Sequence, residues 1–361
     1  MSKIFVSAGD LSGEIHLTNL VKEIKKIEPS VHIIGEGGQY LKEVCGEFVC
    51  DIVNINAFGF LPIKQIFFLK KVLKQIKKIF LEQKIDKVIL TDYYGFHIIV
   101  ARLAKSLNIP VYYFISPQVW ASRIGRIEKL KQVVKKMLVI FPFEEKLYRD
   151  RGVDAVFVGH PLIDKVAQKE NFNITQPPII GLFPGSRKDT IKRHLPIILE
   201  TAKILKEKLN ANFVMFSASQ SQFLNANFPE YIRLANADDW DTRKSIDIAI
   251  CPSGTVSLEN ALLGIPMAVM YKLSNFNYFF IKAIIKVKYI TIVNILAGKS
   301  IVPEFIQFDA FPQKIANNII KQLAPQNYQN KTQEILSIRK IFGSSGAVKR
   351  AADIILSGKC N

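Results

Sequence analysis

The sequence predicts an α/β protein built from two doubly wound domains that face each other across a cleft. A short β-rich run at Lys3–Ala8 leads through the turn Gly9–Glu14 into a helix over Ile15–Ile27. The same order returns in the second half, where Ile179–Phe183 is followed by Pro184–Arg187 and a long helix. Repeated strand, small-residue turn and helix are typical of parallel sheets covered by helices. The 361 residues, 49% of them hydrophobic, suffice for two such domains.

Residues 1–165 make up the first expected domain. Buried apolar runs predict its strands, and longer amphipathic segments predict its helices. The expected strands are Lys3–Ala8, Val31–Ile34, Val88–Thr91, Val111–Ile115, Met137–Phe141 and Val156–Val158. The expected helices are Ile15–Ile27, Phe58–Lys84, Phe96–Leu107, Ser122–Lys136 and Phe143–Arg151. The glycine-rich run Gly35–Gly38 is expected to be a turn after the second strand.

Residues 166–342 make up the second expected domain, and the polar segment Lys165–Pro178, which ends in Pro-Pro, is the expected linker. The expected strands are Ile179–Phe183, Phe213–Phe216, Ile232–Leu234, Ile246–Ile250 and Met267–Tyr271. A helix ends near Leu209, and others cover Asp238–Ser245, Val256–Leu263, Gln313–Leu323 and Thr332–Phe342. After a glycine break, residues 343–361 carry a last helix, Ala347–Leu356, which we expect to cross back to the first domain.

The composition excludes several classes of function. The five histidines are scattered and the four cysteines form no CxxC pair, so we expect neither a metal site nor a cofactor. No signal peptide follows Met1, and lysines interrupt every apolar run before it reaches the ~20 residues of a membrane span. We therefore expect a cytoplasmic protein. Its net charge of +18 indicates an anionic partner, such as nucleic acid, membrane headgroups or phosphorylated substrates.

The stretch Ile250–Pro266 has the pattern of an anion site. An apolar strand ends before Ser253-Gly254-Thr255, and a helix follows that a glycine and a proline terminate. The free N–H groups of such a helix start attract anions. Glu259 lies about one turn inside, where its carboxylate can accept hydrogen bonds from a sugar diol. The alternative is that Glu259 only stabilises the helix dipole.

Acidic residues mark the ends of two strands in the first domain. Asp92 follows the buried strand Val88–Thr91, and ligands gather at the carboxyl ends of strands in open α/β sheets. The alternative for Asp92 is a helix N-cap. The turn Gly9–Glu14 contains Asp10 and is a weak phosphate-binding signal; the alternative is a tight connection from strand to helix. Trp120, beyond the strand Val111–Ile115, is either a lid over the core or a wall of a substrate cleft.

The segment Phe58–Lys84 predicts an amphipathic helix with a basic face. At ~100° per residue, one side is apolar and the other carries lysines, among which Phe67 and Leu81 also point outward. We expect this helix to contact an anionic lipid surface; the alternatives are a core-facing helix with a solvated lysine face, and an RNA groove. The expected membrane contacts are Phe67, Lys70, Lys71, Lys74, Lys77, Lys78 and Leu81. The segment Tyr278–Tyr289 is a second candidate for apolar contact.

A set of sequence blocks then resembles a known family. The blocks are SAGDLSGE at 7–14, SPQVWASR at 116–123, FPFEEKLY at 141–148, GHPLID at 159–164, LFPGSR at 182–187, SGTVSLENALLGIPMAV at 253–269 and NILAGKSIVPEFIQ at 294–307. In this order and spacing, the chain resembles the lipid-A-disaccharide synthases, glycosyltransferase family 19, whose GT-B fold has two Rossmann-like domains. The resemblance covers nearly the whole chain, from Val6 to about Asp353.

The resemblance implies an inverting, metal-independent transfer. UDP-2,3-diacylglucosamine donates its diacylglucosamine to the 6-hydroxyl of 2,3-diacylglucosamine-1-phosphate (lipid X), giving the β-1,6-linked disaccharide 1-phosphate and UDP. This step of lipid A (lipopolysaccharide) synthesis occurs at the cytoplasmic face of the inner membrane of Gram-negative bacteria. Both substrates carry acyl chains and phosphate, so the basic helix would hold the enzyme at the phospholipid surface. The family can also form homodimers that exchange C-terminal segments. A nucleic-acid partner is not expected.

The resemblance also implies roles for individual residues. Asp92 matches the catalytic base, with Asp10 as the main alternative. The expected UDP-sugar contacts are Gly185, Ser186, Arg187, Ser253, Gly254, Thr255, Glu259 and Asn294. The expected acceptor-side residues are Ser12, Gly13, Glu14 and Trp120. Without the resemblance, Arg187 could equally form a surface salt bridge.

The sequence departs from the family's pattern at two points. In the turn Gly9–Glu14 the family commonly has glutamate first and aspartate last, whereas this chain has Asp10 first and Glu14 last. Gly95 stands where the family usually carries another acid, which removes one competitor for the role of base. Two alternatives stay open for the whole chain. One is another UDP-sugar enzyme of the same fold, such as a UDP-GlcNAc epimerase or a lipid-II-type transferase, and the other is a basic binding protein without activity.

Overall fold

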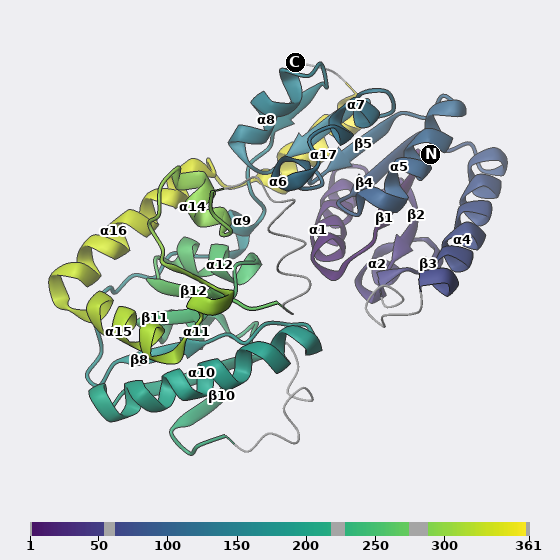
Figure 1. Ribbon diagram of the computed structural model, residues 1–361. Coiled ribbons are helices and arrows are strands. Elements are labelled where there is room, and N and C mark those ends of the chain that lie inside the picture. Colours follow the sequence, from purple (N-terminus) through teal and green to yellow (C-terminus); the bar gives the residue numbers. More distant parts are fainter. Residues whose placement is uncertain (1, 54–61, 218–227, 274–287, 359–361) are drawn as a thin grey trace. The chain divides into compact units, whose positions relative to one another are not determined.

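The computed structural model describes residues 2–53, 62–217, 228–273 and 288–358. It divides into two compact units, each described by itself (Figure 1). Unit 1 comprises residues 1–164 together with 342–361, and unit 2 comprises residues 165–341. Each unit contains one parallel sheet with helices between its strands, which is the α/β class that the sequence predicts.

Unit 1 is built on a seven-stranded sheet of order β3-β2-β1-β4-β5-β6-β7. Its strands are β1 (Lys3–Ala8), β2 (His32–Gly37), β3 (Glu47–Asp51), β4 (Lys87–Thr91), β5 (Val111–Phe114), β6 (Lys136–Val139) and β7 (Ala155–Phe157). Its helices are α1 (Leu11–Ile27), α2 (Gln39–Val44), α4 (Pro62–Glu82), α5 (Tyr94–Ser106), α6 (Val119–Ser122), α7 (Arg126–Lys131), α8 (Pro142–Arg149), α9 (Leu162–Lys165, which reaches the boundary) and α17 (Ala347–Ser357).

The direction of winding in unit 1 reverses between β1 and β4. The chain runs outward from β1 to β3 on one side of this point and from β4 to β7 on the other. The two central strands are parallel neighbours, and their register pairs Ala8 with Thr91. Their carboxyl ends therefore lie at the same edge of the sheet, where ligands bind in open α/β folds. Asp10 and Asp92 follow these two ends directly.

Unit 2 is built on a six-stranded sheet of order β10-β9-β8-β11-β12-β13. Its strands are β8 (Ile179–Leu182), β9 (Asn212–Ser217), β10 (Ile232–Asn236), β11 (Ile248–Cys251), β12 (Met267–Tyr271) and β13 (Glu304–Ile306). Its helices are α10 (Lys188–Leu209), α11 (Trp240–Ser245), α12 (Thr255–Leu263), α14 (Ile292–Ala297), η2 (Gln307–Asp309), α15 (Pro312–Leu323) and α16 (Pro325–Ile341).

The winding of unit 2 reverses in the same way, between β8 and β11. These strands are parallel neighbours, with Leu182 paired to Ile250. The turns that follow them, Pro184–Arg187 and Ser253–Gly254, lead into α10 and α12. Both turns, which contain UDP contacts that the resemblance implies, thus lie at one edge of one sheet.

Helices cover both faces of each sheet, and this explains the apolar composition of the strands. Ile89 and Leu90, neighbours on β4, belong to two different buried clusters because successive side chains point to opposite faces. On one face, α17 packs beside α1, and Ala351 and Ile355 share a buried cluster with Leu17 (Figure 1). This packing is why the last residues of the chain belong to unit 1.

The predicted turn at Gly35–Gly38 is wrong, because β2 continues to Gly37. Gly35 is buried, and a Cβ there would collide with the sulfur of Cys45 and come within 2.9 Å of Val6. The glycine therefore permits close packing inside the sheet rather than a change of chain direction. As a result Glu36 lies in the core with 0% of its surface exposed.

Several shorter elements also differ from the prediction. The expected helix Ser122–Lys136 is shorter than predicted: α6 ends at Ser122, α7 covers only Arg126–Lys131 with Gly125 as its N-cap, and Lys136 begins β6. The sequence did not predict α2, β3 or β13, which are too short to show a clear period. The expected helix Thr332–Phe342 begins earlier, at Pro325, because proline is well tolerated in the first turn of a helix.

Candidate functional site

Two turns meet at the switch point of unit 1. Gly9 is buried against Tyr93, so that a Cβ at position 9 would collide with the tyrosine ring. A Cβ at Gly13 would lie 3.2 Å from Cγ2 of Thr91. The turn after β1 and the turn after β4 thus pack directly on each other. We call the region that they form, with Asp10 and Asp92, the acid site.

The backbone of Asp92 adopts an uncommon conformation. Its φ is +48° and that of Tyr93 is +41°, both in the left-handed region that residues with a side chain seldom occupy. The N–H of Asp92 donates to the carbonyl of Ile115 at 3.1 Å. The carbonyl of Asp92 accepts from the Tyr113 hydroxyl and from Nδ1 of His97, the latter at 2.9 Å. Strain held in this way by several partners is typical of functional sites.

The carboxyl group of Asp92 is not used as a helix cap. The N-cap of α5 is Tyr93, and no side chain caps that helix. Burial and the nearby negative charge of Asp10 raise the pKa of Asp92 to about 6. A carboxylate with a pKa close to the working pH is a more effective general base than one with an ordinary pKa.

Asp10 has a structural task that Asp92 lacks. Its Oδ1 accepts a hydrogen bond from the N–H of Gly13 at 2.9 Å, which makes Asp10 the N-cap of α1. Ser12, in the first turn of this helix, is exposed to solvent, and Gly13 is buried. The arrangement assigns the cap to Asp10 and leaves the Asp92 carboxylate available for chemistry.

Glu14, expected on the acceptor side, is buried within unit 1. This side chain is 1% exposed, and its Oε1 accepts from the N–H groups of Gly38 at 3.0 Å and Leu41 at 2.9 Å. Glu14 therefore caps the N-terminus of α2, although it is far from that helix in the sequence. Burial raises the pKa of Glu14. An acceptor-side role for Glu14 stays a prediction.

Trp120 is oriented by an acid that the sequence analysis did not single out. Its indole Nε1 donates to Oε1 of Glu144 at 3.1 Å, and the hydroxyl of Ser116 donates to the same oxygen at 2.7 Å. Burial raises the pKa of Glu144 to about 7. A glutamate three residues after a helix N-cap is the sequence signal that could have identified Glu144, because such a side chain reaches back to the N–H of the cap. Here Oε2 of Glu144 accepts from the N–H of Phe141 at 3.2 Å.

The first turn at the switch point of unit 2 follows β8. Gly185 has φ +110°, which favours glycine, and a Cβ there would lie 2.9 Å from Thr190. Ser186 and Arg187 are exposed to solvent, and Arg187 is the N-cap of α10. Within the described residues Arg187 forms no ion pair, so the surface salt bridge considered above is not formed.

The second turn follows β11 and opens the N-terminus of α12. Gly254 is the N-cap, no side chain caps the helix, and Gly254 and Thr255 are exposed while Ser253 is half-buried. Uncapped N–H groups at a helix start carry a partial positive charge and bind phosphate. Because β8 and β11 are neighbours, the starts of α10 and α12 share one edge of the sheet. We call this edge the helix-terminus site.

Glu259 is held by an arginine that the sequence analysis missed. Arg243, 1% exposed, forms an ion pair with Oε2 of Glu259 at 2.8 Å and donates to Oδ1 of Asn260 at 2.9 Å. Its guanidinium lies 4.9 Å from the ring centre of Phe183 and 5.0 Å from that of Trp240. The pair fixes Glu259 in one orientation.

Asn294, an expected UDP-sugar contact, is buried within unit 2. It is 0% exposed, its Oδ1 accepts from the N–H groups of Ile301 and Val302, and its Nδ2 donates to Glu304. These bonds use the amide to fasten the loop before β13. Nδ2 also donates to the carbonyl of Val302 at 2.8 Å, so the amide is fully hydrogen-bonded within its own loop, and contact with a UDP-sugar stays a prediction.

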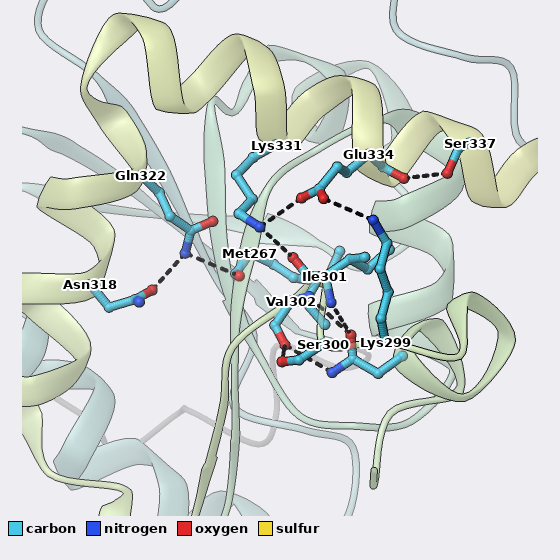
Figure 2. Close-up of polar contacts among 11 residues, drawn as sticks. Met267, Lys299, Ser300, Ile301, Val302, Asn318, Gln322, Lys331, Glu334 and Ser337 are labelled. Carbon is cyan, nitrogen blue, oxygen red and sulfur yellow. Dashed lines mark hydrogen bonds and ion pairs between the residues drawn. The ribbon is translucent and has the colours of Figure 1, made fainter. Parts of the chain in front are cut away.

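The same loop is tied to α16 by charged side chains. Lys331 donates to the carbonyl of Ile301 at 3.2 Å and pairs with Glu334 at 2.7 Å. Glu334 also pairs with Lys299 at 3.2 Å (Figure 2). Residues of the block that begins at position 294 therefore anchor this loop to α16.

The exposed face of α4 is basic with apolar side chains among the lysines. Phe67 is 68% exposed and Leu81 59% exposed, whereas Val72 and Ile76 are buried in the core. The lysines expected on this face are all exposed: Lys70, Lys71, Lys74, Lys77 and Lys78. Ile66 is also exposed. Most of Tyr278–Tyr289 lies outside the described residues.

No group of three or more histidine, cysteine, aspartate or glutamate side chains among the described residues is arranged to hold a metal ion. None of the described helices is both long enough and apolar enough to span a membrane.

Comparison with solved structures shows the fold. The UDP-GlcNAc 2-epimerase from Neisseria meningitidis, bound to UDP-GlcNAc, matches 98% of this chain and 100% of that chain, with a TM-score of 0.66 and 13% identity. MurG of Acinetobacter baumannii matches with a TM-score of 0.63 and 14% identity, over 99% of this chain and 100% of that chain. Proteins of this kind have the GT-B fold, which confirms the predicted fold class.

Comparison of sequences shows the family. A family model described as Lipid-A-disaccharide synthetase matches residues 4–356. The lipid-A-disaccharide synthase of Syntrophus aciditrophicus (strain SB) is 37% identical over 98% of this chain and 97% of that protein. The lipid-A-disaccharide synthase of Geobacter metallireducens is 36% identical over 98% of this chain and 96% of that protein. The chain belongs to the lipid-A-disaccharide synthase family, glycosyltransferases of lipid A biosynthesis.

Proposed function

We propose that this enzyme transfers 2,3-diacylglucosamine from its UDP derivative to the 6-hydroxyl of 2,3-diacylglucosamine-1-phosphate (lipid X), with inversion at the anomeric carbon. The products are the β-1,6-linked disaccharide 1-phosphate and UDP. The observation that carries the proposal is Asp92, a half-buried carboxylate beside a sheet switch point whose pKa is raised to about 6. Membership of the family supports the choice of substrates.

In this proposal Asp92 is the general base. Its carboxylate takes the proton of the acceptor hydroxyl as the oxygen attacks the anomeric carbon of the donor. The bond from that carbon to the UDP oxygen breaks, and the electron pair leaves with UDP. Trp120 and Ser12 are on the acceptor side, and the hydrogen bond from Trp120 to Glu144 supports this role because it fixes the face of the indole.

The helix-terminus site holds the UDP. The exposed guanidinium of Arg187 and the free N–H groups at Gly254 and Thr255 offer positive charge to the diphosphate as its negative charge grows. These protein groups supply the stabilisation that makes the proposed transfer metal-independent. Glu259, oriented by Arg243, accepts hydrogen bonds from the ribose hydroxyls.

The test is turnover of UDP-2,3-diacylglucosamine with lipid X, with the product identified by mass and by linkage. A β-1,6-linked disaccharide carrying one phosphate supports the proposal. Formation of an epimerised UDP-sugar, or transfer to a polyprenol-linked acceptor only, would instead place the enzyme beside the other UDP-sugar enzymes of the same fold.

We also propose that the basic face of α4 binds the inner membrane from the cytoplasmic side. Clustered exposed lysines attract anionic headgroups, at about 1 kcal/mol each, and Phe67 and Leu81 can enter the acyl boundary. Reversal of Lys70, Lys71 and Lys74 to glutamate is expected to release the protein from vesicles that contain anionic lipid.

A matched control replaces three exposed lysines of α10 with glutamate: Lys192, Lys203 and Lys208. The net charge of this variant changes by the same amount, and its sedimentation with vesicles should stay near that of the unmodified enzyme. Equal loss in both variants would mean that total charge, not α4, determines binding. Assembly into a homodimer stays a prediction, which sedimentation velocity measures.

A further inference from the structure

A chain of buried polar groups runs beneath the acid site. Ser7 on β1 and Glu36 on β2 are partners in the sheet register, and the Ser7 hydroxyl oxygen lies 2.7 Å from Oε1 of Glu36. The same hydroxyl oxygen lies 2.7 Å from Nε2 of His97 on α5. Nδ1 of His97 lies 2.9 Å from the carbonyl oxygen of Asp92. We call Ser7, Glu36 and His97 the buried polar chain; all three are 0% exposed.

Counting hydrogen atoms fixes which group donates at each link. The carbonyl of Asp92 can only accept, so Nδ1 of His97 carries a hydrogen. In a neutral imidazole Nε2 then has no hydrogen and accepts from the Ser7 hydroxyl. That hydroxyl has a single hydrogen, which is now used. The remaining link, between Ser7 and Glu36, is made only if the carboxyl group of Glu36 is protonated and donates.

The alternative distribution has the same number of protons but two charges. His97 would be an imidazolium that donates to Ser7, and Ser7 would donate to a Glu36 carboxylate. Within the described residues, Oε2 of Glu36 has no hydrogen-bond partner, so this form would leave part of a negative charge buried without one. The rings of Tyr93, Phe96 and Tyr113 surround His97 instead of solvent.

The direction of the pKa shifts agrees with the neutral form. Burial raises the pKa of Glu36 to about 8 and lowers the pKa of His97 to about 4. At neutral pH the first group therefore keeps its proton and the second stays uncharged. Serine, histidine and a carboxylic acid are also the residue types of a hydrolytic triad. In the buried polar chain, however, Ser7 lies between the other two residues and is fully buried, which excludes a nucleophilic role for Ser7.

We infer that Glu36, as a protonated acid, and Ser7 together set the tautomer of His97, so that the buried polar chain positions the strained turn that presents the Asp92 carboxylate. This inference rests on the proposed function, since it assigns the chain a purpose in the reaction for which Asp92 is the base. The three residues are positioning residues, because none of them contacts a substrate. Their effect reaches the reaction only through the carbonyl of Asp92.

The first test is spectroscopic and needs no substrate. The chemical shifts of both ring nitrogens of each histidine are measured by NMR on ¹⁵N-histidine-labelled enzyme at neutral pH, with a His97→Gln variant to assign the signal. We expect His97 to be neutral, with the hydrogen on Nδ1 and none on Nε2. A doubly protonated ring, or a neutral ring with the hydrogen on Nε2, would overturn the inference.

The second test is kinetic. Glu36→Gln can still donate to Ser7 through its amide, so we expect kcat within about threefold of the unmodified enzyme. Glu36→Leu removes the donor, and we expect kcat to fall roughly 10- to 100-fold with KM for the donor unchanged, since a small misplacement of a reacting group has an effect of this size. A merely structural role would not separate glutamine from leucine in kcat while KM stays constant.

The matched control is Ile34→Val, on the same strand and in the apolar cluster on that face of the sheet. It reduces core packing without touching the buried polar chain, and its kcat should stay unchanged. If Glu36→Leu keeps full kcat in an active enzyme, the inference fails and the proposed function stands. If the unmodified enzyme makes no disaccharide, the proposed function fails, and the NMR result still decides the protonation of the chain.

Discussion

The acid site and the helix-terminus site occupy equivalent positions, each at the switch point of a parallel sheet, but they are built in opposite ways. The backbone of Asp92 is fixed because its N–H donates to Ile115 and its carbonyl accepts from Tyr113 and His97, and buried polar groups lie behind it. The helix-terminus site is open, with an exposed Arg187 and uncapped N–H groups at α12.

The difference reflects the two kinds of chemistry that we propose. A base needs a shifted pKa and a fixed direction, and both require burial and partners that are far away in the sequence. Phosphate recognition uses the partial charge of backbone N–H groups, which every free helix start possesses. The first site therefore depends on the whole of unit 1, whereas the second depends mainly on two local turns.

The largest effect should come from Asp92→Asn. We expect turnover to fall by about 10³-fold or more, because a general base contributes 10²–10⁴-fold, while UDP still protects the enzyme against thermal unfolding. Near-normal turnover would remove Asp92 from the role of base and with it the contrast between the sites.

Above pH 6 the Asp92→Asn variant should also be more stable than the unmodified enzyme. The pKa of Asp92 rises from 3.8 to about 6 on folding, so the folded state binds more protons and loses stability as pH rises through this range. Replacing the buried carboxylate with a neutral amide removes that loss. Thermal unfolding at pH 5 and pH 8 measures it: the gain in Tm should be larger at pH 8, and an equal gain at both would contradict the assigned pKa.

A smaller effect is expected at the helix-terminus site from Arg187→Ala. Loss of a charge-assisted contact of about 1.5–3 kcal/mol should weaken UDP binding roughly 10- to 100-fold. Isothermal titration with UDP measures the change, and Lys188→Ala, which removes the neighbouring exposed charge, is the control. If the two variants lose equal affinity, Arg187 has no special position.

A finer test of the same site is Thr255→Pro. Thr255 is the first residue of α12, where proline fits a helix but has no N–H to donate. We expect UDP affinity to fall by about 1 kcal/mol, or roughly fivefold, with little change in Tm. Thr255→Ala keeps the N–H and serves as the control; an equal loss there would assign the effect to the side chain.

The smallest effect concerns the coupling between the two acids. Asn caps a helix about as well as Asp, so Asp10→Asn should leave α1 intact while removing one negative charge near Asp92. We expect the acidic limb of the profile of kcat/KM against pH to move to lower pH, with turnover at pH 8 mostly retained. Complete loss of turnover would instead favour Asp10 as the base.

The local features of this protein could be read from its sequence. The strand before Asp92, the turns before α10 and α12, and the repeated order of strand and helix are determined by residues that are neighbours in the chain. Apolar periodicity, glycine and proline act over a few residues, and this is why those predictions agree with the structure. The family resemblance added the reaction, which no local pattern contains.

The partners of the site residues were decided only by the tertiary structure. Glu36 read as part of a turn, yet it pairs with Ser7 because β2 lies beside β1, and His97 joins them from α5. Sheet order and register set such contacts, and neither is encoded in a short stretch of sequence. For the same reason the sequence could not show that Asn294 anchors the loop before β13. A sequence states which groups are available, and packing determines which of them are satisfied and which remain free to act.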